Sequence, residues 1–398
     1  MTWPTKKLGD REFFEILGSG IEKFEGENEY LSTSSIEGNK IIAAEGKITY
    51  KERPSRANMQ PRLNSVWFAR MMNTIKVYSF TEVNKEEVDK YILSTGFAGI
   101  LCNPEKVDPR YLEKIFLSKW FNDLKDSLAS DKAIQKSLNN DDIENFEIPL
   151  PLLSIQQKIV KILDTIQEAV EIQEKIIEKT RELKKSLMAE LFKYGGLSFR
   201  RGRKLKKTEV GEIPEDWEVV RLDKIFKIVA GGDISKLNFS SRKTDKFIYP
   251  IYSNTIENNG LYGFANTYQF EGNCITVTAR GTIGYAIPRF EKFNAIIRLL
   301  VLIPKINLNI IYVSEFINEK IRVAFENTSI PQLTVPRFST FKIPLPSLPE
   351  QREISEILQT IDQKIEIEKK KKELYEELFR TMLNNLMSQE IDVEKLKI

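Results

Sequence analysis

The stretch FEIPLPLLSIQQKIVKIL (146–163) returns 195 positions later as FKIPLPSLPEQREISEIL (341–358). Over 146–172 and 341–367, the two copies share 14 of 27 residues without a gap. Chance alone would give roughly one or two identities, so the chain contains an internal duplication. The organisation of the whole molecule can therefore be worked out from this repeat.

Each copy of the repeat predicts an extended segment that leads into a long helix. The two prolines of IPLP fix φ and favour extended backbone before them. Ser154 and Pro349 then suit a helix start, as an N-cap and a first-turn residue respectively. Apolar residues follow mostly at spacings of three and four, and neither 154–193 nor 350–390 contains proline or glycine. We expect two helices of about 40 residues, each roughly 60 Å long.

A helix of this length needs a partner that covers its apolar stripe. The other copy is the obvious partner, in an antiparallel coiled coil. The alternative is that each helix docks only on its own domain. The middle of the second helix, EIEKKKKE (366–373), is very polar, so the packing should be tighter towards the ends.

Mixed segments of short strands, turns and helices precede each long helix. NCITVTARGTIGYAIP (273–288) predicts a β-hairpin, whereas 108–128 predicts an amphipathic helix, with 306–325 in the matching place of the second half. The expected fold class is α+β: two mixed α/β domains, two long antiparallel coiled-coil helices and an internal pseudo-two-fold repeat. The predicted parts are a first domain (1–150), a first long helix (151–195), a basic linker (196–215), a second domain (216–345) and a second long helix (346–392).

Composition excludes several classes of chemistry. The chain has 398 residues, a net charge of only +3 and no histidine, which removes Ser-His-Asp catalysis and His-ligated metal sites. It has no G-x-x-x-x-G-K-[ST] phosphate loop. Cys102 and Cys274 are the only cysteines, so we expect a reducing compartment, the cytoplasm. The most apolar stretch, AIIRLLVLIP (295–304), is too short to span a bilayer and is interpreted as a buried strand pair.

The duplicated part is the scaffold, and the diverged part is the pair of domains. Symmetric proteins read palindromic DNA because the duplex has local two-fold axes. A near-symmetric frame with two unlike domains should instead read a split, asymmetric DNA site, with the helices fixing the spacer.

The duplicated IPLP…Q lead into a long helix, behind two unlike domains, resembles the specificity subunit of type I restriction–modification systems. The resemblance covers the whole chain, and IPQLTV (330–335) also looks typical of that family. The first copy departs from the motif, with Ser-Ile-Gln-Gln (154–157) where the second has Pro-Glu-Gln-Arg (349–352).

The resemblance implies two target recognition domains that each read one DNA half-site, and a chain without catalysis of its own. It implies two methyltransferase (modification) subunits as partners, and restriction subunits with translocase and nuclease activity. S-adenosylmethionine, ATP and Mg would then belong to those partners, and this chain would hold no cofactor or metal.

Candidate DNA-contacting residues are arginines, lysines and small polar residues in loops and in the basic tract FRRGRKLKK (199–207), because these side chains bind phosphates and base edges. Arg70 and Arg280 are predicted to be equivalent in the two halves and to contact phosphate. The full set is Lys51, Arg53, Arg56, Asn58, Arg62, Arg70, Arg200, Arg201, Arg203, Arg242, Lys243, Ser253, Asn254, Asn258, Arg280 and Gln332.

Three other interpretations stay open at the level of sequence. The chain could be a fused restriction–methylation enzyme or nuclease, since carboxylates lie near a lysine in PEDWEVVRLDK (214–224). It could be a coiled-coil adaptor that binds only protein, or the specificity subunit of another restriction type.

Overall fold

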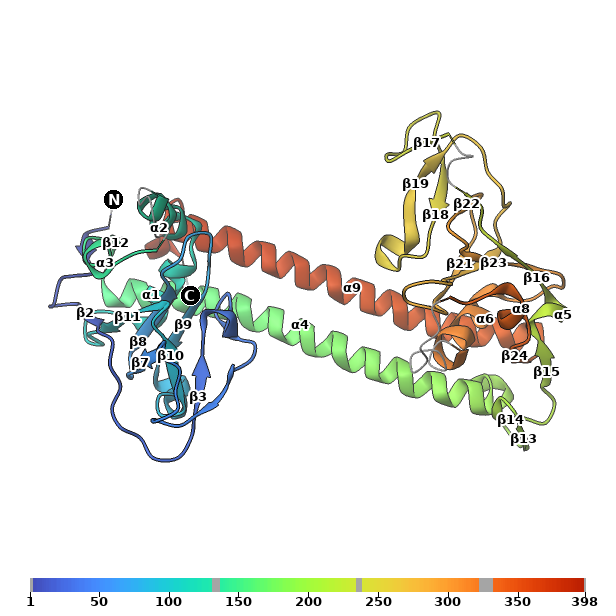
Figure 1. Ribbon diagram of the computed structural model, residues 1–398, viewed down its shortest axis with the longest axis horizontal. Helices are drawn as coiled ribbons and strands as arrows, with labels where there is room; N and C mark the ends of the chain where they lie inside the picture. The colour runs from blue at the N-terminus through green and yellow to red at the C-terminus, as the bar shows by residue number, and fades with distance from the viewer. Residues whose placement is uncertain (1–2, 131–136, 234–237, 322–331, 397–398) are drawn as a thin grey trace. The chain divides into compact units, whose positions relative to one another are not determined.

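The computed structural model describes residues 3–130, 137–233, 238–321 and 332–396 (Figure 1). The chain divides into two compact units, unit 1 (Met1–Lys175 with Lys369–Ile398) and unit 2 (Ile176–Glu368). Each unit contains one mixed α/β domain and a part of both long helices.

The two long helices are α4 (Leu153–Tyr194) and α9 (Leu348–Met387), green and red in Figure 1. Ser154 lies in the first turn of α4 and is therefore not its N-cap, whereas Pro349 lies in the first turn of α9, as predicted. After the first-turn Pro349 of α9, neither helix contains proline or glycine, and this uninterrupted run of good helix formers explains their length.

Within each unit the two helices pack against each other in antiparallel order. In unit 1, Ile159 and Leu163 of α4 share an apolar core with Leu383 of α9. Lys372 lies 2.8 Å from Glu174 in the same unit. In unit 2, Lys184 lies 2.8 Å from Asp362. Residues later in α4 thus contact residues earlier in α9, as in an antiparallel pair. The alternative, in which each helix docks only on its own domain, is wrong.

Each domain is built around a four-stranded sheet of the same connectivity. In unit 1 the order is β2-β11-β8-β9, and in unit 2 it is β16-β23-β20-β21. The unit 1 strands are β2 (Phe14–Leu17), β11 (Phe97–Cys102), β8 (Ser65–Ala69) and β9 (Val77–Phe80). The unit 2 strands are β16 (Phe226–Ala230), β23 (Leu300–Pro304), β20 (Cys274–Val277) and β21 (Ala286–Arg289). Strands β20 and β21 pair antiparallel and confirm the predicted hairpin.

A second four-stranded sheet completes each domain. Unit 1 has β6 (Gly46–Ile48), β3 (Asn28–Leu31), β10 (Tyr91–Ser94) and β7 (Ala57–Met59). Unit 2 has β17 (Phe239–Ser240), β19 (Leu261–Ala265), β18 (Tyr249–Tyr252) and β22 (Asn294–Ala295). These second sheets differ in strand order between the two units.

Short two-stranded ribbons contain the IPLP segments. β1 (Thr5–Lys7) pairs antiparallel with β12 (Glu147–Pro149), and β15 (Glu218–Arg221) pairs with β24 (Lys342–Leu345). Prolines are tolerated there because a two-stranded ribbon leaves one edge of each strand without a ladder partner. The basic segment after α4 is folded, with β13 (Leu205–Thr208) and β14 (Gly211–Pro214) forming a hairpin.

The helix expected over 108–128 is two helices, α1 (Pro109–Leu117) and α2 (Lys119–Ser130). The break falls at Ser118, whose ψ of 148° is extended. Asp108 caps α1 by accepting from the Arg110 backbone N–H. The counterpart in unit 2 is α6 (Ile310–Phe316), continued by a π-helical turn (Ile317–Ile321).

A short helix precedes the IPLP segment in each unit: α3 (Asn140–Glu144) in unit 1 and α8 (Val335–Ser339) in unit 2. In the described part of the chain, no helix combines the length and apolarity that a membrane crossing requires. Nor do the described residues contain a cluster of acidic and cysteine side chains suited to a metal ion.

Candidate nucleic-acid interface

The repeated glutamine joins each long helix to its own domain. Gln156 donates to the carbonyls of Pro151 (2.8 Å) and Lys106 (3.0 Å), and its Oε1 accepts from the Asp108 N–H (2.9 Å). Asp108 is the N-cap of α1, so one buried side chain ties the start of α4 to the start of α1. Burying an amide is favourable only when its donors and acceptor are satisfied, as they are here.

Gln351 does the same in unit 2. Its amide donates to the Pro346 carbonyl (2.8 Å), and its Oε1 accepts from the N–H of Asn309 (2.9 Å), the N-cap of α6. A tyrosine completes each joint, since Tyr111 donates to the Pro149 carbonyl and Tyr312 to the Pro344 carbonyl, both at 3.0 Å. The duplicated IPLP…Q motif is therefore the joint between helix and domain.

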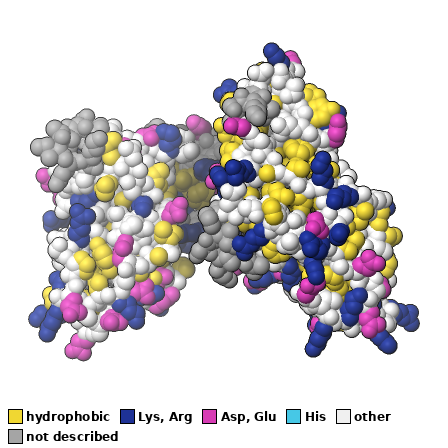
Figure 2. Space-filling view, turned by 45° about the vertical axis from the view of Figure 1, so that its right-hand side comes forward, with side chains coloured by type: hydrophobic (Ala, Val, Ile, Leu, Met, Phe, Trp, Pro, Cys, Tyr) yellow, Lys and Arg dark blue, Asp and Glu magenta, His cyan; other side chains and the backbone are white. Residues whose placement is uncertain are grey.

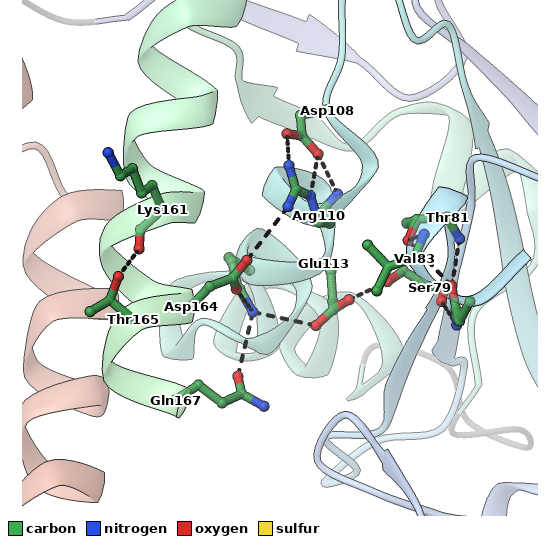
Figure 3. Close-up of polar contacts among 12 residues, drawn as sticks. Ser79, Thr81, Val83, Asp108, Arg110, Glu113, Lys161, Asp164, Thr165 and Gln167 are labelled. Carbon is green, nitrogen blue, oxygen red and sulfur yellow. Dashed lines mark hydrogen bonds and ion pairs between the residues drawn. The ribbon is translucent and has the colours of Figure 1, made fainter. Parts of the chain in front are cut away.

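The first joint is followed by a polar network that fastens α1 to α4 in unit 1 (Figure 3). Asp164 of α4 lies 2.9 Å from Lys114 and 3.8 Å from Arg110. Burial opposes the charge on Lys114, but Glu113 and Asp164 outweigh that effect and raise its pKa. Glu113 also accepts from Ser79 of β9, as Figure 3 shows. The network is fully paired and positions the domain, so we assign it no chemistry.

The second joint contains a buried ion pair that the first lacks. Glu350 is only 1% exposed and accepts from Arg203, from the indole N–H of Trp217 (3.0 Å) and from the Gly196 backbone N–H (3.0 Å). The matching position in the first copy is Ile155, which packs into an apolar core. The difference was visible in the sequence as the departure from the motif.

The basic tract largely serves this folded segment. Arg203 is bound to Glu350 and Asp216, and Arg200 donates to the Gly195 carbonyl (3.0 Å) and to Glu190 (3.1 Å). Arg201 is exposed and has no ion pair with any other described residue. Of the three arginines predicted here, Arg201 is the best placed to meet phosphate.

The predicted loop of unit 1 is part folded and part open. Arg53 lies over the Tyr50 ring, 4.2 Å from its centroid, and Arg62 is 3.7 Å from Glu15. The half-buried Asn58 accepts at its carbonyl from the Gly20 N–H. Lys51 and Arg56 are exposed and have no side-chain partner within the described ranges.

Arg70 is tied into the fold of unit 1. It donates to the Phe97 carbonyl (2.9 Å), the Leu138 carbonyl (3.4 Å) and Asn140 Oδ1 (2.8 Å). Burial lowers its pKa. Its guanidinium therefore stabilises loops that meet at the edge of the sheet.

The predicted equivalence of Arg70 and Arg280 is wrong by one residue. The Arg70 carbonyl accepts from the Leu138 N–H, whereas in unit 2 it is the Ala279 carbonyl that accepts from the Leu333 N–H. Leu138 and Leu333 are 195 positions apart, the period of the repeat. Arg70 thus matches Ala279, and Arg280 matches Met71, which is 54% exposed.

The candidates of unit 2 divide in the same way. Arg242 and Lys243 are exposed after β17, and Asn258 is exposed in a turn with a φ of 46°. Ser253 is buried. Asn254 is a clamp, because it accepts from the Ala279 N–H (2.7 Å) and donates to the Ile297 carbonyl (2.6 Å).

Arg280 is exposed and donates to Gln332 Oε1 at 3.1 Å, so these two predicted residues lie together. The turn at Ile297–Arg298 lies beside them through Asn254 and was not among the predicted contacts. This turn was missed at the level of sequence because it lies within the apolar run 295–304, which was interpreted as buried strands. Arg298 within that run was a signal that the chain reaches the surface there. Figure 2 shows, on the unit at the right, hydrophobic side chains with Lys and Arg around them.

The chain matches the family described as type I restriction modification DNA specificity domain, over residues 2–181 and 214–377. It is 30% identical over 339 residues to a Methanocaldococcus jannaschii protein provisionally named type I restriction enzyme MjaX specificity subunit, covering 79% of this chain and 78% of that one. It is 30% identical over 274 residues to the MjaVIII specificity subunit of the same organism, covering 64% of each chain.

Solved structures show the same fold. A chain from a structure on complex assembly and conformational transition of the type I R-M system aligns with a TM-score of 0.65 at 20% identity, over 97% of each chain. The type I restriction-modification S subunit from M. genitalium aligns with a TM-score of 0.55 at 17% identity, over 97% of this chain and 96% of that one. Taken with the duplicated joint and the two domains, the family match means that this chain belongs to the specificity subunits of type I restriction–modification systems.

Proposed function

We propose that the chain reads a split, asymmetric DNA sequence, with one half-site for each target recognition domain and no catalysis of its own. The observation that carries the proposal is a contrast between parts. The joints at Gln156 and Gln351 and the first sheets are alike, whereas the loops at the sheet edges are not. Equal frames with unequal reading loops suit two different half-sites.

Exposed cations on both domains support contact with DNA. Lys51 and Arg56 in unit 1, and Arg242, Lys243 and Arg280 in unit 2, are exposed side chains on loops. Such groups supply salt-dependent affinity through phosphates, and they read sequence where they reach base edges. The net charge of +3 fits local patches of this kind rather than a polycationic surface.

Two methyltransferase subunits, and restriction subunits with them, would dock on this chain and supply the chemistry. S-adenosylmethionine, ATP and Mg would bind to those partners. The paired state of the polar network around Lys114 supports a chain that positions rather than reacts. Action on cellular DNA would place the complex in the cytoplasm.

Methylation mapping tests the proposal. Cells that carry this chain with its modification subunit are sequenced by a method that detects methyladenine. We expect a split, asymmetric motif that vanishes when this chain is deleted. Methylation that persists without the chain, or a continuous motif, would refute the proposal.

Two other functions predict different results. An adaptor that binds only protein would show no DNA binding at any salt concentration, even with the modification subunit present. A specificity subunit of another restriction type would give a split motif with a single fused catalytic partner. Purification of the assembled complex and identification of its subunits separates these cases.

A further inference from the structure

The turn at Ile297–Arg298 has an unusual backbone. Ile297 has a φ of 52° and Arg298 a φ of 60°, so two consecutive residues with Cβ atoms are left-handed. This region is disfavoured for residues other than glycine, and a β-branched residue such as isoleucine is a genuine outlier there. Glycine or asparagine would form such a turn more easily. The turn itself therefore does not explain why isoleucine and arginine occupy these two positions.

The surrounding chain holds the turn in place. The backbone N–H groups of Ile297 and Arg298 donate to the carbonyls of Gly232 (3.0 Å) and Gly231 (3.3 Å). Gly231 must be a glycine, since a Cβ there would lie 2.6 Å from the Ala295 carbonyl carbon. Asn254 fixes the Ile297 carbonyl from the other side at 2.6 Å. Strain of this kind persists only where the structure over-determines it, and such sites cluster at functional positions.

The two side chains of the strained turn are exposed to solvent. Ile297 is 45% exposed, and Arg298 is exposed. Arg298 makes no ion pair or side-chain hydrogen bond with another residue of the described ranges. An exposed isoleucine beside an arginine without a partner is a poor choice for solvent, but the pair suits a groove that presents both polar base edges and apolar thymine methyl groups.

The turn lies where loops from three strands meet. β16 ends at Ala230, β20 ends at Val277 and β23 begins at Leu300, and the two strands that flank β23 both pair antiparallel with it. These three strand ends therefore share one edge of the sheet. Asn254 links the turn to Ala279, and the next residue, Arg280, carries a second exposed cation. The acidic neighbour Asp233 has partners of its own.

The first domain has no arginine at the position that matches Arg298. Phe97 pairs with Ala69 in unit 1, and Leu300 pairs with Val277 in unit 2. With Ala279 matching Arg70, this register places Gly96 where unit 2 has Arg298. The position of the guanidinium is therefore specific to the second domain, as a residue that distinguishes the two half-sites should be.

We propose that Arg298 reads a guanine in the half-site bound by the second domain, with Ile297 against an apolar group of the groove such as a thymine methyl, and Asn254 as the residue that positions the turn. The inference rests on the proposed function. Arginine bound through two N–H groups to guanine O6 and N7 is the commonest specific contact in the major groove. Arg280, paired with Gln332, is left to contact phosphate.

The test uses Arg298→Ala and Arg298→Lys in the complete complex with the modification subunit. We expect methylation mapping to show one guanine position of one half-site relaxed to several bases, with the other half-site unchanged. Affinity for the cognate DNA should fall roughly 10- to 100-fold, as for loss of one bidentate base contact. Lysine keeps the positive charge but lacks the two parallel N–H donors of the guanidinium group, so Arg298→Lys should not restore the guanine preference.

Lys227→Ala, which removes an exposed cation from β16 of the same domain, is the matched control and should leave the motif intact. If the wild-type chain yields no split motif, the proposed function fails. If it does and both Arg298 variants keep every motif position, the inference alone is overturned. A uniform loss of affinity on all sequences would also overturn it, because that result marks a phosphate contact.

Ile297→Gly separates reading from folding. It relieves the left-handed strain, so thermal stability should stay equal or rise, while affinity for the cognate site falls. Unchanged affinity with raised stability would show that the isoleucine is not used against DNA. Asn254→Ala should weaken the guanine preference in the same direction as Arg298→Ala. Asn254→Asp keeps the acceptor for the Ala279 N–H but loses the donor to the Ile297 carbonyl, so it should restore that preference only in part.

Discussion

The joints and the edge loops of this molecule have diverged to different extents. Gln156 and Gln351 make the same pair of contacts, to a proline carbonyl and to the N–H of a helix N-cap residue. At the edge of the first sheet, by contrast, unit 1 has Met71 at the position of Arg280 in unit 2, and Gly96 at the position of Arg298. A joint must satisfy buried polar groups and tolerates little change, whereas an exposed loop can vary with its ligand.

The largest expected effect comes from shortening the shared scaffold. Deletion of 170–176 and 370–376 removes facing stretches of α4 and α9, because Glu174 meets Lys372. Seven residues of helix span about 10 Å, which corresponds to about three base pairs. Methylation mapping should show a spacer shortened by that amount and both half-sites intact. Altered half-sites would contradict the idea that the helices set only the spacing.

The buried pair of the second joint should give the next largest effect. Glu350→Ala leaves Arg203, which is 11% exposed, without its main partner, and also removes the acceptor of Trp217. We expect a loss of about 3 kcal/mol in the free energy of unfolding. Denaturant unfolding measures it, with Glu356→Ala, an exposed glutamate of the same helix, as a control that should change little. Equal effects of the two variants would mean that the pair stabilises nothing.

The equality of the two joints can be tested directly. Gln156→Ala and Gln351→Ala should each cost about 1–3 kcal/mol, since each leaves buried backbone groups unpaired. Two of the contacts are the same at both joints, so the two losses should be similar, with the larger loss at Gln156, which also donates to the Lys106 carbonyl. A large loss at one glutamine and none at the other, in the same unfolding experiment, would break the equivalence of the joints.

The smallest effect concerns a single phosphate contact. Arg280→Ala should weaken DNA binding several-fold and lower the slope of log affinity against log salt by about one. A salt titration of binding with cognate and unrelated DNA measures both changes. Met71→Ala, at the matching position of unit 1, should leave the slope as it is. An unchanged slope for the Arg280 variant would remove that residue from the DNA contacts.

The candidate DNA contacts stay predictions, and the structure shows only which of these side chains are exposed. Arg56 and Arg242 are exposed on loops. Sequence could not tell them from Arg70, Arg200 and Arg203, whose guanidinium groups are occupied inside the fold. The partner of an arginine is set by chain segments far away in the sequence, and composition does not reveal them.

The sequence by itself determined the duplication, the two long helices and the extended IPLP segment that leads into each helix, because periodicity and repeated identity are carried by residues next to one another. Only the tertiary structure decided which residues occupy equivalent positions in the two domains, as the one-residue error at Arg70 shows. It also decided where the strained turn lies. Gly231, Asn254, Ala279 and Arg298 are separated along the chain and come together only when the strands of one sheet edge pair.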